Sequence, residues 1–208
     1  MQANLNKQIL AFALAILPVP FTTQAPLAQW SDSRQQDGCE EAGAVMAMSW
    51  AQGEKTISKE AAKKAIIAIS DFELKKYAEY RDVALDDVRK WIFIDYFKYD
   101  AKKVRVVENI KLENIKSELV KGNLVLVPTD GRLLKNPYFT APGPLTHLLV
   151  IKGYDKVKKE FITNDPGTRR GENYRYKESV LFKAISAYPT GHHLPIKKIE
   201  KKMLVVEK

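Results

Sequence analysis

The single cysteine of the chain, Cys39, stands where a polar stretch meets an apolar run with helical spacing. Asp37 followed by Glu40 has the pattern of a capping box, which predicts a helix with Asp37 as its N-cap and Cys39 at its second position. Unpaired backbone N–H groups and the positive end of the helix dipole would lower the pKa of a thiol there, and the thiolate is the nucleophilic form. The carboxylates of Glu40 and Glu41 oppose that effect. Cys39 is therefore a candidate nucleophile, and the alternative is a buried cysteine that only packs.

A nucleophilic cysteine needs a base, and the sequence offers three histidines. His192 and His193 are neighbours in a loop-like stretch, where we expect surface residues, and as a metal pair they lack further ligands. His147 opens a strand-like run, so the strand would hold its imidazole rigidly beside the preceding loop. His147 is the candidate base, and the alternative is a hydrogen-bonded histidine of the core.

The base needs an acceptor for its other ring nitrogen, and a predicted hairpin supplies one. If the hairpin turns near Lys156, residues equidistant from that point face each other, and His147 pairs with Asp165. Directly opposed residues have Cβ atoms about 4.5–5.5 Å apart. Asp155 would lie at the turn, about 26 Å along the strand from His147. Asp165 is therefore the candidate orienting residue, although it could also cap the turn that follows it.

To position Cys39, His147 and Asp165, the chain is expected to form helices first and a sheet after them. The first half of the sequence has the apolar spacing of helices, and the second half has β-branched runs bounded by Pro, Gly, Asn and Asp. Helices are predicted at 39–50, at 59–69 behind a Ser58 cap, from a capping box at Ser70 to about Tyr80, at 85–97, from 112 to a stop at Gly122, and at 177–186. Strands are predicted at 103–108, 123–128, 147–154, 160–165 and 202–207. This order predicts an α+β fold with a helical N-terminal half and an antiparallel sheet in the C-terminal half.

The composition limits the classes of protein that remain. A chain of 208 residues without a repeat or flexible linker predicts one domain, and one cysteine excludes an internal disulfide or a multi-cysteine metal site. The net charge of +9 raises the hypothesis of a nucleic-acid binder, but the lysines are scattered among acidic residues and no nucleic-acid motif is present. We therefore predict no specific nucleic-acid binding, although the charge could steer acidic substrates.

Cys39, His147 and Asp165, in that chain order, make the sequence resemble the papain-like cysteine peptidases. More closely, it resembles the bacteriocin-processing (double-glycine) peptidase-like family. The matching pieces are "VPFTTQAP", "DGCEEAGAVMAMSW", "HLLVIKGYD" and "FITNDPGTRRGENYRY", and "KMLVVE" fits a closing strand. Many members carry Gly-Pro after the cysteine, whereas this sequence carries Glu40 and Glu41.

The resemblance implies a two-lobe papain-like fold, in which the cysteine helix packs on a sheet that carries the histidine. It implies hydrolysis of a peptide bond through an acyl-enzyme intermediate, without a cofactor or metal. Cys39 would be the nucleophile, His147 the general base and later acid, and Asp165 the residue that orients the imidazole.

A glutamine upstream of the cysteine would complete the oxyanion hole together with the backbone N–H of Cys39. Papain-like enzymes commonly place it about six residues before the cysteine, where this sequence has Ser33. Gln35 and Gln36 lie so close to Cys39 that their side chains would not swing back over the sulfur. Gln24 belongs to the matching opening segment and is the predicted oxyanion residue.

The N-terminal residues 1–17 contain an apolar run, Ile9 to Leu17, that has the character of a short signal-peptide core. The run is too short to span a bilayer, and three roles remain open: an export signal, an anchor or an internal helix. The protein would accordingly be exported, membrane-associated or cytoplasmic. Because Gln24 must be retained, any cleavage is expected before Val19, and the peptidase-like domain is predicted to occupy residues 18–208.

The leading hypothesis is a thiol-dependent peptidase that acts on a peptide or protein substrate, with the loop Asn136–Thr146 beside the substrate cleft. The alternative is a catalytically inactive papain-like fold that binds peptides or proteins. No transmembrane helix bundle is predicted, and the sequence does not indicate an oligomeric state.

Overall fold

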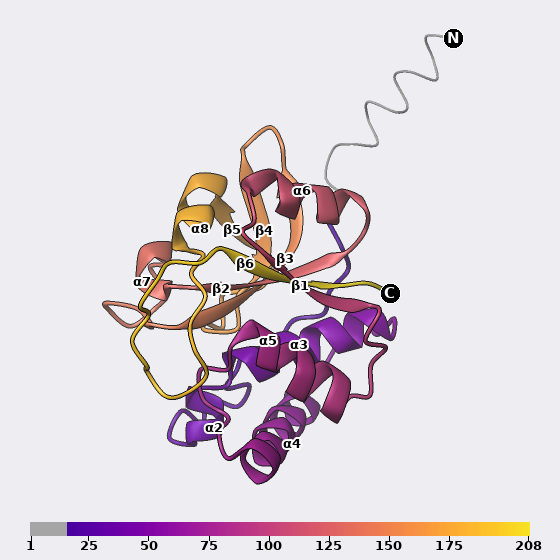
Figure 1. Cartoon of the computed structure of the whole chain (residues 1–208), viewed down its shortest axis with the longest axis vertical. Coiled ribbons are helices and arrows are strands. Elements are labelled where there is room, and N and C mark those ends of the chain that lie inside the picture. The colour runs from indigo at the N-terminus through magenta and orange to yellow at the C-terminus, as the bar shows by residue number, and fades with distance from the viewer. Residues whose placement is uncertain (1–15) are drawn as a thin grey trace.

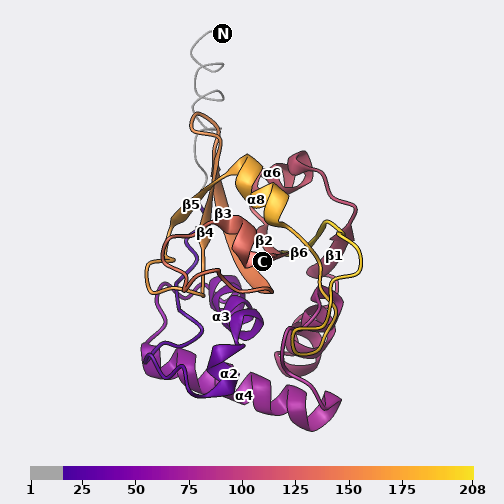
Figure 2. The same cartoon turned by 90° about the vertical axis from the view of Figure 1, so that its left-hand side faces the viewer.

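The computed structural model describes residues 16–208, and its α+β architecture confirms the predicted fold class (Figure 1). A helical lobe from the first half of the chain lies against one face of a six-stranded antiparallel sheet, and shorter helices cover the other face (Figure 2). The helices are α2 (Ser33–Gln36), α3 (Cys39–Ala51), α4 (Lys59–Tyr77), α5 (Leu85–Asp87), η1 (Val88–Tyr96), α6 (Leu112–Val120), α7 (Gly131–Leu134) and α8 (Glu178–Ala184). The strands are β1 (Val104–Glu108), β2 (Leu124–Thr129), β3 (His147–Asp155), β4 (Glu160–Asn164), β5 (Tyr174–Lys177) and β6 (Lys202–Val206). Residues 1–15, which hold most of the predicted signal, anchor or internal helix, lie outside the described residues.

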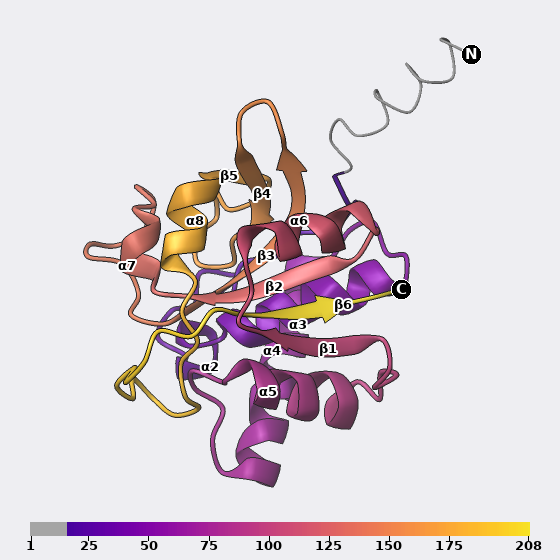
Figure 3. The ribbon, with the colours of Figure 1, turned by 45° about the horizontal axis from the view of Figure 1, so that its top comes forward.

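The strand order in the sheet is β1-β6-β2-β3-β4-β5, and every neighbouring pair is antiparallel. Strand β6 lies between β1 and β2 although it follows both in the chain (Figure 3). Alternate residues of β2 enter two separate cores. Leu124 and Leu126 pack with the helical lobe, whereas Val125 and Val127 pack with α6 and α8. The sheet is therefore buried on both faces, which holds its strands rigidly beneath the loops at their ends.

Helix α3 is buried on every side. Its residues from Cys39 to Trp50 are all buried, because the helix is enclosed by β3, α4 and η1. A Cβ atom at Gly43 would lie 2.5 Å from Cδ2 of Leu148, so any larger residue would push against the buried Leu148 side chain of β3. The close contact fixes the start of α3, and with it Cys39, relative to the strand that begins with His147.

The predicted cap of α3 is wrong. Its N-cap is Gly38, no side chain caps it, and Cys39 is its first residue. Asp37 instead ends the short helix α2, a single turn that the sequence analysis did not predict.

Two further helix predictions differ from the structure. Helix α4 runs without a break through Ser70, because the Ser70 hydroxyl donates to the carbonyl of Ile66 and to Glu41 instead of capping a new helix. The Ser58 cap of α4 is confirmed, since its hydroxyl accepts from the backbone N–H of Ala61. The predicted helix at 85–97 is one turn of α-helix followed by the π-helix η1.

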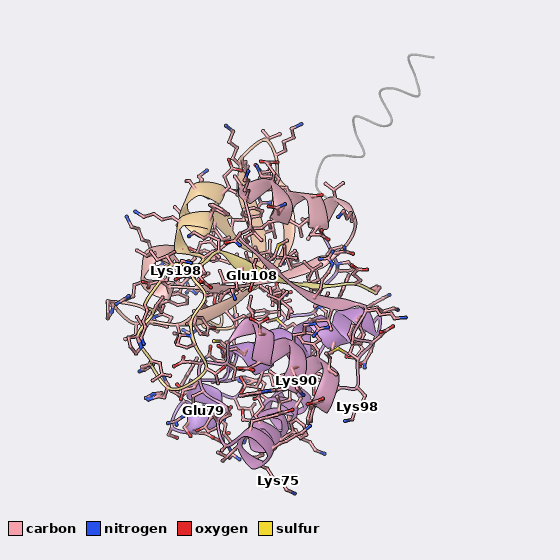
Figure 4. The ribbon with its side chains drawn as sticks, in the orientation of Figure 1. Lys75, Glu79, Lys90, Lys98, Glu108 and Lys198 are labelled. Carbon is pink, nitrogen blue, oxygen red and sulfur yellow. The ribbon has the colours of Figure 1, made fainter. Side chains whose placement is uncertain are left out.

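Charged side chains extend from many different elements. Lys75, Lys90 and Lys198 lie on α4, on η1 and on the loop before β6, and carboxylates such as Glu79 and Glu108 lie among them (Figure 4). This scatter is in keeping with the prediction of no specific nucleic-acid site, which remains a prediction.

Candidate active site

A cleft of about 1560 Å³ brings together segments that are far apart in the sequence. Gln24, Cys39 and His147 all line it, and so does most of the loop that precedes His147. Tyr138 and Phe139 from that loop lie at the cleft, as the sequence predicted for the segment Asn136–Thr146. Three of the four predicted site residues therefore share one cavity, and the fourth, Asp165, lies directly behind His147.

His147 and Asp165 form a fully buried pair. Nε2 of His147 lies 2.8 Å from Oδ1 of Asp165, and the two side chains are 2% and 0% exposed. The predicted hairpin register is wrong, because Val150 faces Asn164 and a bulge interrupts the ladder between Ile151 and Gly153. Continued by one residue, this register sets position 149 opposite Asp165, so His147 reaches Asp165 as a diagonal neighbour.

The carboxylate of Asp165 accepts hydrogen bonds at both oxygens. Oδ1 also accepts from the backbone N–H of Gly167 (3.0 Å), and Oδ2 accepts from the amide of Asn136 (3.1 Å) and the hydroxyl of Tyr176 (2.6 Å). Burial alone would raise the pKa of Asp165, but His147 and these donors outweigh it and hold the pKa below its ordinary value. Asp165 is thus an ionised acceptor for the imidazole at neutral pH.

Asn136 and Tyr176 were not predicted as site residues. Asn136 belongs to the loop after α7 and Tyr176 to β5, and the two side chains also bond each other at 2.7 Å. Neither has a local sequence pattern that points to Asp165. The only available signal was alternation in the strand "YRYK", which places Tyr176 on the opposite face from its neighbours.

The imidazole of His147 is held on two further sides. The ring of Phe139 contacts it edge to face, with centroids 5.3 Å apart. A Cβ atom at Gly167 would lie 2.9 Å from Cε1 of the imidazole, so the absence of a side chain there makes room for the ring. Because Nε2 is committed to Asp165, Nδ1 is the ring nitrogen left for another partner.

The thiol of Cys39 donates a hydrogen bond to Oε2 of Glu40 at 3.1 Å. Burial is the main reason that its pKa is raised well above the ordinary value, and the charge of Glu40 adds to the effect. A hydrogen bond from the backbone N–H of Leu148, the residue after His147, acts in the opposite direction. The predicted lowering of the thiol pKa by the helix start is therefore wrong for this conformation, because burial and an adjacent carboxylate dominate.

Gln24 is buried at the cleft, 6% exposed, and is held at two points. Its Nε2 donates to the backbone carbonyl of Gln36 at 2.6 Å, and its backbone N–H donates to the carbonyl of Pro166 at 2.9 Å. The other two candidates differ: the side chain of Gln36 is exposed, and Gln35 is buried with its amide directed to the carbonyl of Gln29. An amide NH₂ group has two donors, so Gln24 retains one beyond its bond to Gln36.

The N-terminal segment that carries Gln24 is bound to the β3–β4 hairpin. The backbone N–H of Leu17 donates to the carbonyl of Lys152, the residue at the bulge, and Nζ of Lys152 donates back to the carbonyl of Val19. The amide of Asn164 contacts the carbonyls of Val19 and Pro20. These bonds place Gln24 relative to the His147–Asp165 pair.

The model of the Peptidase_C39 like family matches residues 16–190. The chain belongs to this family. The crystal structure of a candidate C39-like peptidase from Bacillus anthracis superposes with a TM-score of 0.56 at 14% identity, covering 94% of this chain and 98% of that one. Comparison with curated proteins gives no match.

Membership of the Peptidase_C39 like family confirms the predicted family and supports a peptidase function in general. The match to the Bacillus anthracis structure supports the papain-like fold, and peptides are the class of substrate that the family suggests. Within residues 16–208, no helix combines the length and the apolar character that a membrane span requires.

The two glutamates that replace Gly-Pro in this C39-like chain are both completely buried. Oε1 of Glu40 accepts from the hydroxyl of Tyr188 at 2.5 Å, and burial raises the pKa of Glu40 to about 7. Glu41 accepts from Ser70 at 2.9 Å, and burial raises the pKa of Glu41 and of the neighbouring Glu73 well above the ordinary value. A cluster of three buried carboxyl groups therefore lies behind the cysteine.

The other acidic candidate, Asp155, lies at the hairpin turn as predicted. Its carboxylate accepts from the backbone N–H groups of Val157 and Lys158 and pairs with Arg175 at 2.9 Å. It has no contact with His147 and belongs to the turn.

Proposed function

We propose that the protein is a thiol peptidase that hydrolyses peptide bonds through an acyl-enzyme intermediate. The observation that carries this proposal is the His147–Asp165 pair, buried at 2.8 Å on the wall of the cleft to which Cys39 also belongs. A buried imidazole held by an ionised carboxylate is oriented to accept a proton at its other ring nitrogen.

In the first step, the thiol of Cys39 turns from Glu40 towards Nδ1 of His147 and transfers its proton there. The thiolate attacks the carbonyl carbon of the substrate, and the carbonyl oxygen becomes an oxyanion. Asp165 stabilises the imidazolium that forms, without taking its proton. The free N–H of Gln24 and the backbone N–H of Cys39 donate to the oxyanion.

In the second step, His147 gives its proton to the leaving amine, the C–N bond breaks, and a thioester to Cys39 remains. Water then attacks the thioester carbonyl while His147 accepts the proton of that water. The C–S bond breaks, the sulfur recovers a proton from His147, and a carboxylic acid product leaves.

The cleft supports a peptide-like substrate. Large apolar side chains at its rim are partly exposed, including Leu27 at 39%, Trp30 at 40% and Tyr138 at 44%. Partly exposed aromatic residues on a concave surface are typical of sites that bind a ligand.

The decisive experiment is digestion of an unbiased peptide library by the wild type and by Cys39→Ala, with the products identified by mass spectrometry. We expect new peptide ends with the wild type only, while circular dichroism shows the same fold for both proteins. Full activity in Cys39→Ala would exclude the thiol mechanism.

One observation favours a second candidate, a peptide-binding module without turnover. The thiol donates to Glu40 and its pKa is raised, which is the opposite of what a resting thiolate requires. A binding module would enrich peptides from the same library without cutting them, and its Cys39 would not react with iodoacetamide at neutral pH.

A further inference from the structure

Three potential metal ligands from two distant parts of the chain meet at the rim of the cleft. The carboxylate of Asp37 and one ring nitrogen each of His192 and His193 lie within 4.8 Å of one another. Asp37 ends α2, two residues before Cys39, and the histidines lie on the long loop between α8 and β6. Figure 1 shows this loop, drawn in yellow, descending beside α2. No third ligand for the histidine pair was predicted from the sequence. Asp37 is far from the pair in the sequence and comes close to it only in the folded chain.

Hydrogen bonds to the helical lobe hold the backbone of this loop. The backbone N–H of His193 donates to Asp82 at 2.5 Å, and that of Gly191 donates to the carbonyl of Arg81 at 3.1 Å. The hydroxyl of Thr190 donates to Asp87 at 2.5 Å. The segment on both sides of His192 is thus fixed before any ligand binds, which lowers the entropic cost of binding.

The backbone conformation also directs the two imidazoles to the same side. His193 has φ +50°, in the left-handed region that residues other than glycine rarely adopt. In an extended segment, consecutive side chains point in opposite directions. Here the rings of His192 and His193 stack with centroids 4.1 Å apart. The two rings therefore present their nitrogens to the same region, next to Asp37.

Charged groups of both signs lie near Asp37. Asp37 is partly buried, and the carboxylate of Asp82 and the guanidinium of Arg81 both lie near enough to act on its charge. Asp82 is already engaged by Thr146 and by His193, so it contributes negative charge but not a free ligand. Asp37 is therefore the carboxylate left to bind a cation together with the two imidazoles.

We propose that Asp37, His192 and His193 bind a transition-metal dication of the zinc class at the rim of the cleft. Two imidazoles and one carboxylate are ligands that zinc prefers, and a set of three leaves one coordination position open. Binding requires the exposed rings to turn so that their nitrogens converge. The ion would tie the α2–α3 junction to the loop before β6 and narrow the cleft beside Cys39. Any influence of this narrowing on catalysis rests on the proposed function, whereas zinc binding itself does not.

The test is calorimetric titration of Zn²⁺ into the full chain, which reads binding independently of activity. We expect one equivalent to bind the wild type, and binding about tenfold weaker or more in His192→Ala, His193→Ala and Asp37→Asn, since even outer groups of metal sites contribute 10–100-fold. Asp86→Asn, an exposed carboxylate of the same lobe, serves as the control and should bind as the wild type does.

Cys39→Ala tests whether zinc binds at the thiol of Cys39 instead of at the proposed site. This variant should bind zinc with the affinity of the wild type. With Co²⁺ as the probe, we expect weak visible bands without a thiolate charge-transfer band. The proposal is overturned if the wild type binds no zinc, if both histidine variants bind it as the wild type does, or if Cys39→Ala alone abolishes binding.

Discussion

The thiol of Cys39 donates its hydrogen bond to Glu40, the next residue in the chain, at 3.1 Å. The sulfur is therefore protonated in this conformation, and it faces a carboxylate that a second donor, Tyr188, also holds in place. On the proposed mechanism, the thiol must leave Glu40 before His147 can take its proton. Glu40 thus competes with the base for the same proton.

Replacing Glu40 should lower the pKa of the cysteine. Glu40→Gln removes a buried negative charge beside the sulfur, and the new amide can donate to a thiolate. The rate of iodoacetamide labelling, measured from pH 5 to 10, should then rise at a lower pH than in the wild type. Glu41→Gln is the matched control, because Glu41 bonds Ser70 and should leave the profile unchanged. Equal profiles for the wild type and Glu40→Gln would contradict this role.

The buried carboxyl groups should make the fold less stable as the pH rises. The pKa of Glu73 is raised well above its ordinary value of 4.5 by burial and by Glu41, so the folded protein keeps a proton that the unfolded chain loses. The free energy of unfolding should therefore fall above pH about 4.5, by up to about 1.4 kcal/mol per pH unit for each such group. Urea unfolding at pH 5, 6 and 7 measures this slope.

Glu73→Gln should flatten that slope, because glutamine does not ionise. Glu113→Gln, whose side chain is 78% exposed, should leave it as in the wild type. A wild-type stability that rises between pH 5 and 7, with no difference in Glu73→Gln, would show that the cluster does not keep its protons.

Asp165 should control turnover through the orientation of His147. Asp165→Asn keeps the shape of the side chain but removes its charge, and we expect kcat to fall by about a hundredfold or more with little change in KM. Asp155→Asn is the control, since Asp155 lies at the turn with Arg175. The reverse pattern would show that Asp155 supplies the orienting carboxylate.

Gln24 should contribute mainly to the transition state. Gln24→Ala is expected to lower kcat by about 10²–10³-fold, the cost of one oxyanion-hole donor. Gln36→Ala should be nearly neutral, because Gln24 binds the backbone carbonyl of Gln36 and that carbonyl remains. A loss confined to Gln36→Ala would transfer the role to Gln36.

The contact between His147 and Asp165 was predicted correctly, but the strand register that produces it was not. The His147–Asp165 pairing survived a wrong register, because the true register differs by two residues and an even shift keeps each side chain on its face of the sheet. The error itself came from a turn that lies further along the chain and shifts the pairing by three residues, and the bulge at Lys152 takes one of those three back. Neither has a distinct sequence signal in this hairpin.

Other features depend on contacts between distant segments and could not be predicted locally. The partnership of Asp165 with Asn136 and Tyr176 joins three different elements, and so does the meeting of Asp37 with the histidine pair. The raised pKa of Cys39 follows from the burial of α3 on every side, which its helical stripe of apolar residues did not reveal.

The position of β6 between β1 and β2 also constrains how the protein is made. A ribosome produces β1 and β2 well before β6, so a nascent chain has two unpaired strand edges where the finished sheet has hydrogen bonds. The sheet that carries His147 cannot close until residues 202–206 have emerged. A chain still under synthesis would therefore present open edges at β1 and β2, which are the kind of exposed edge that chaperones protect.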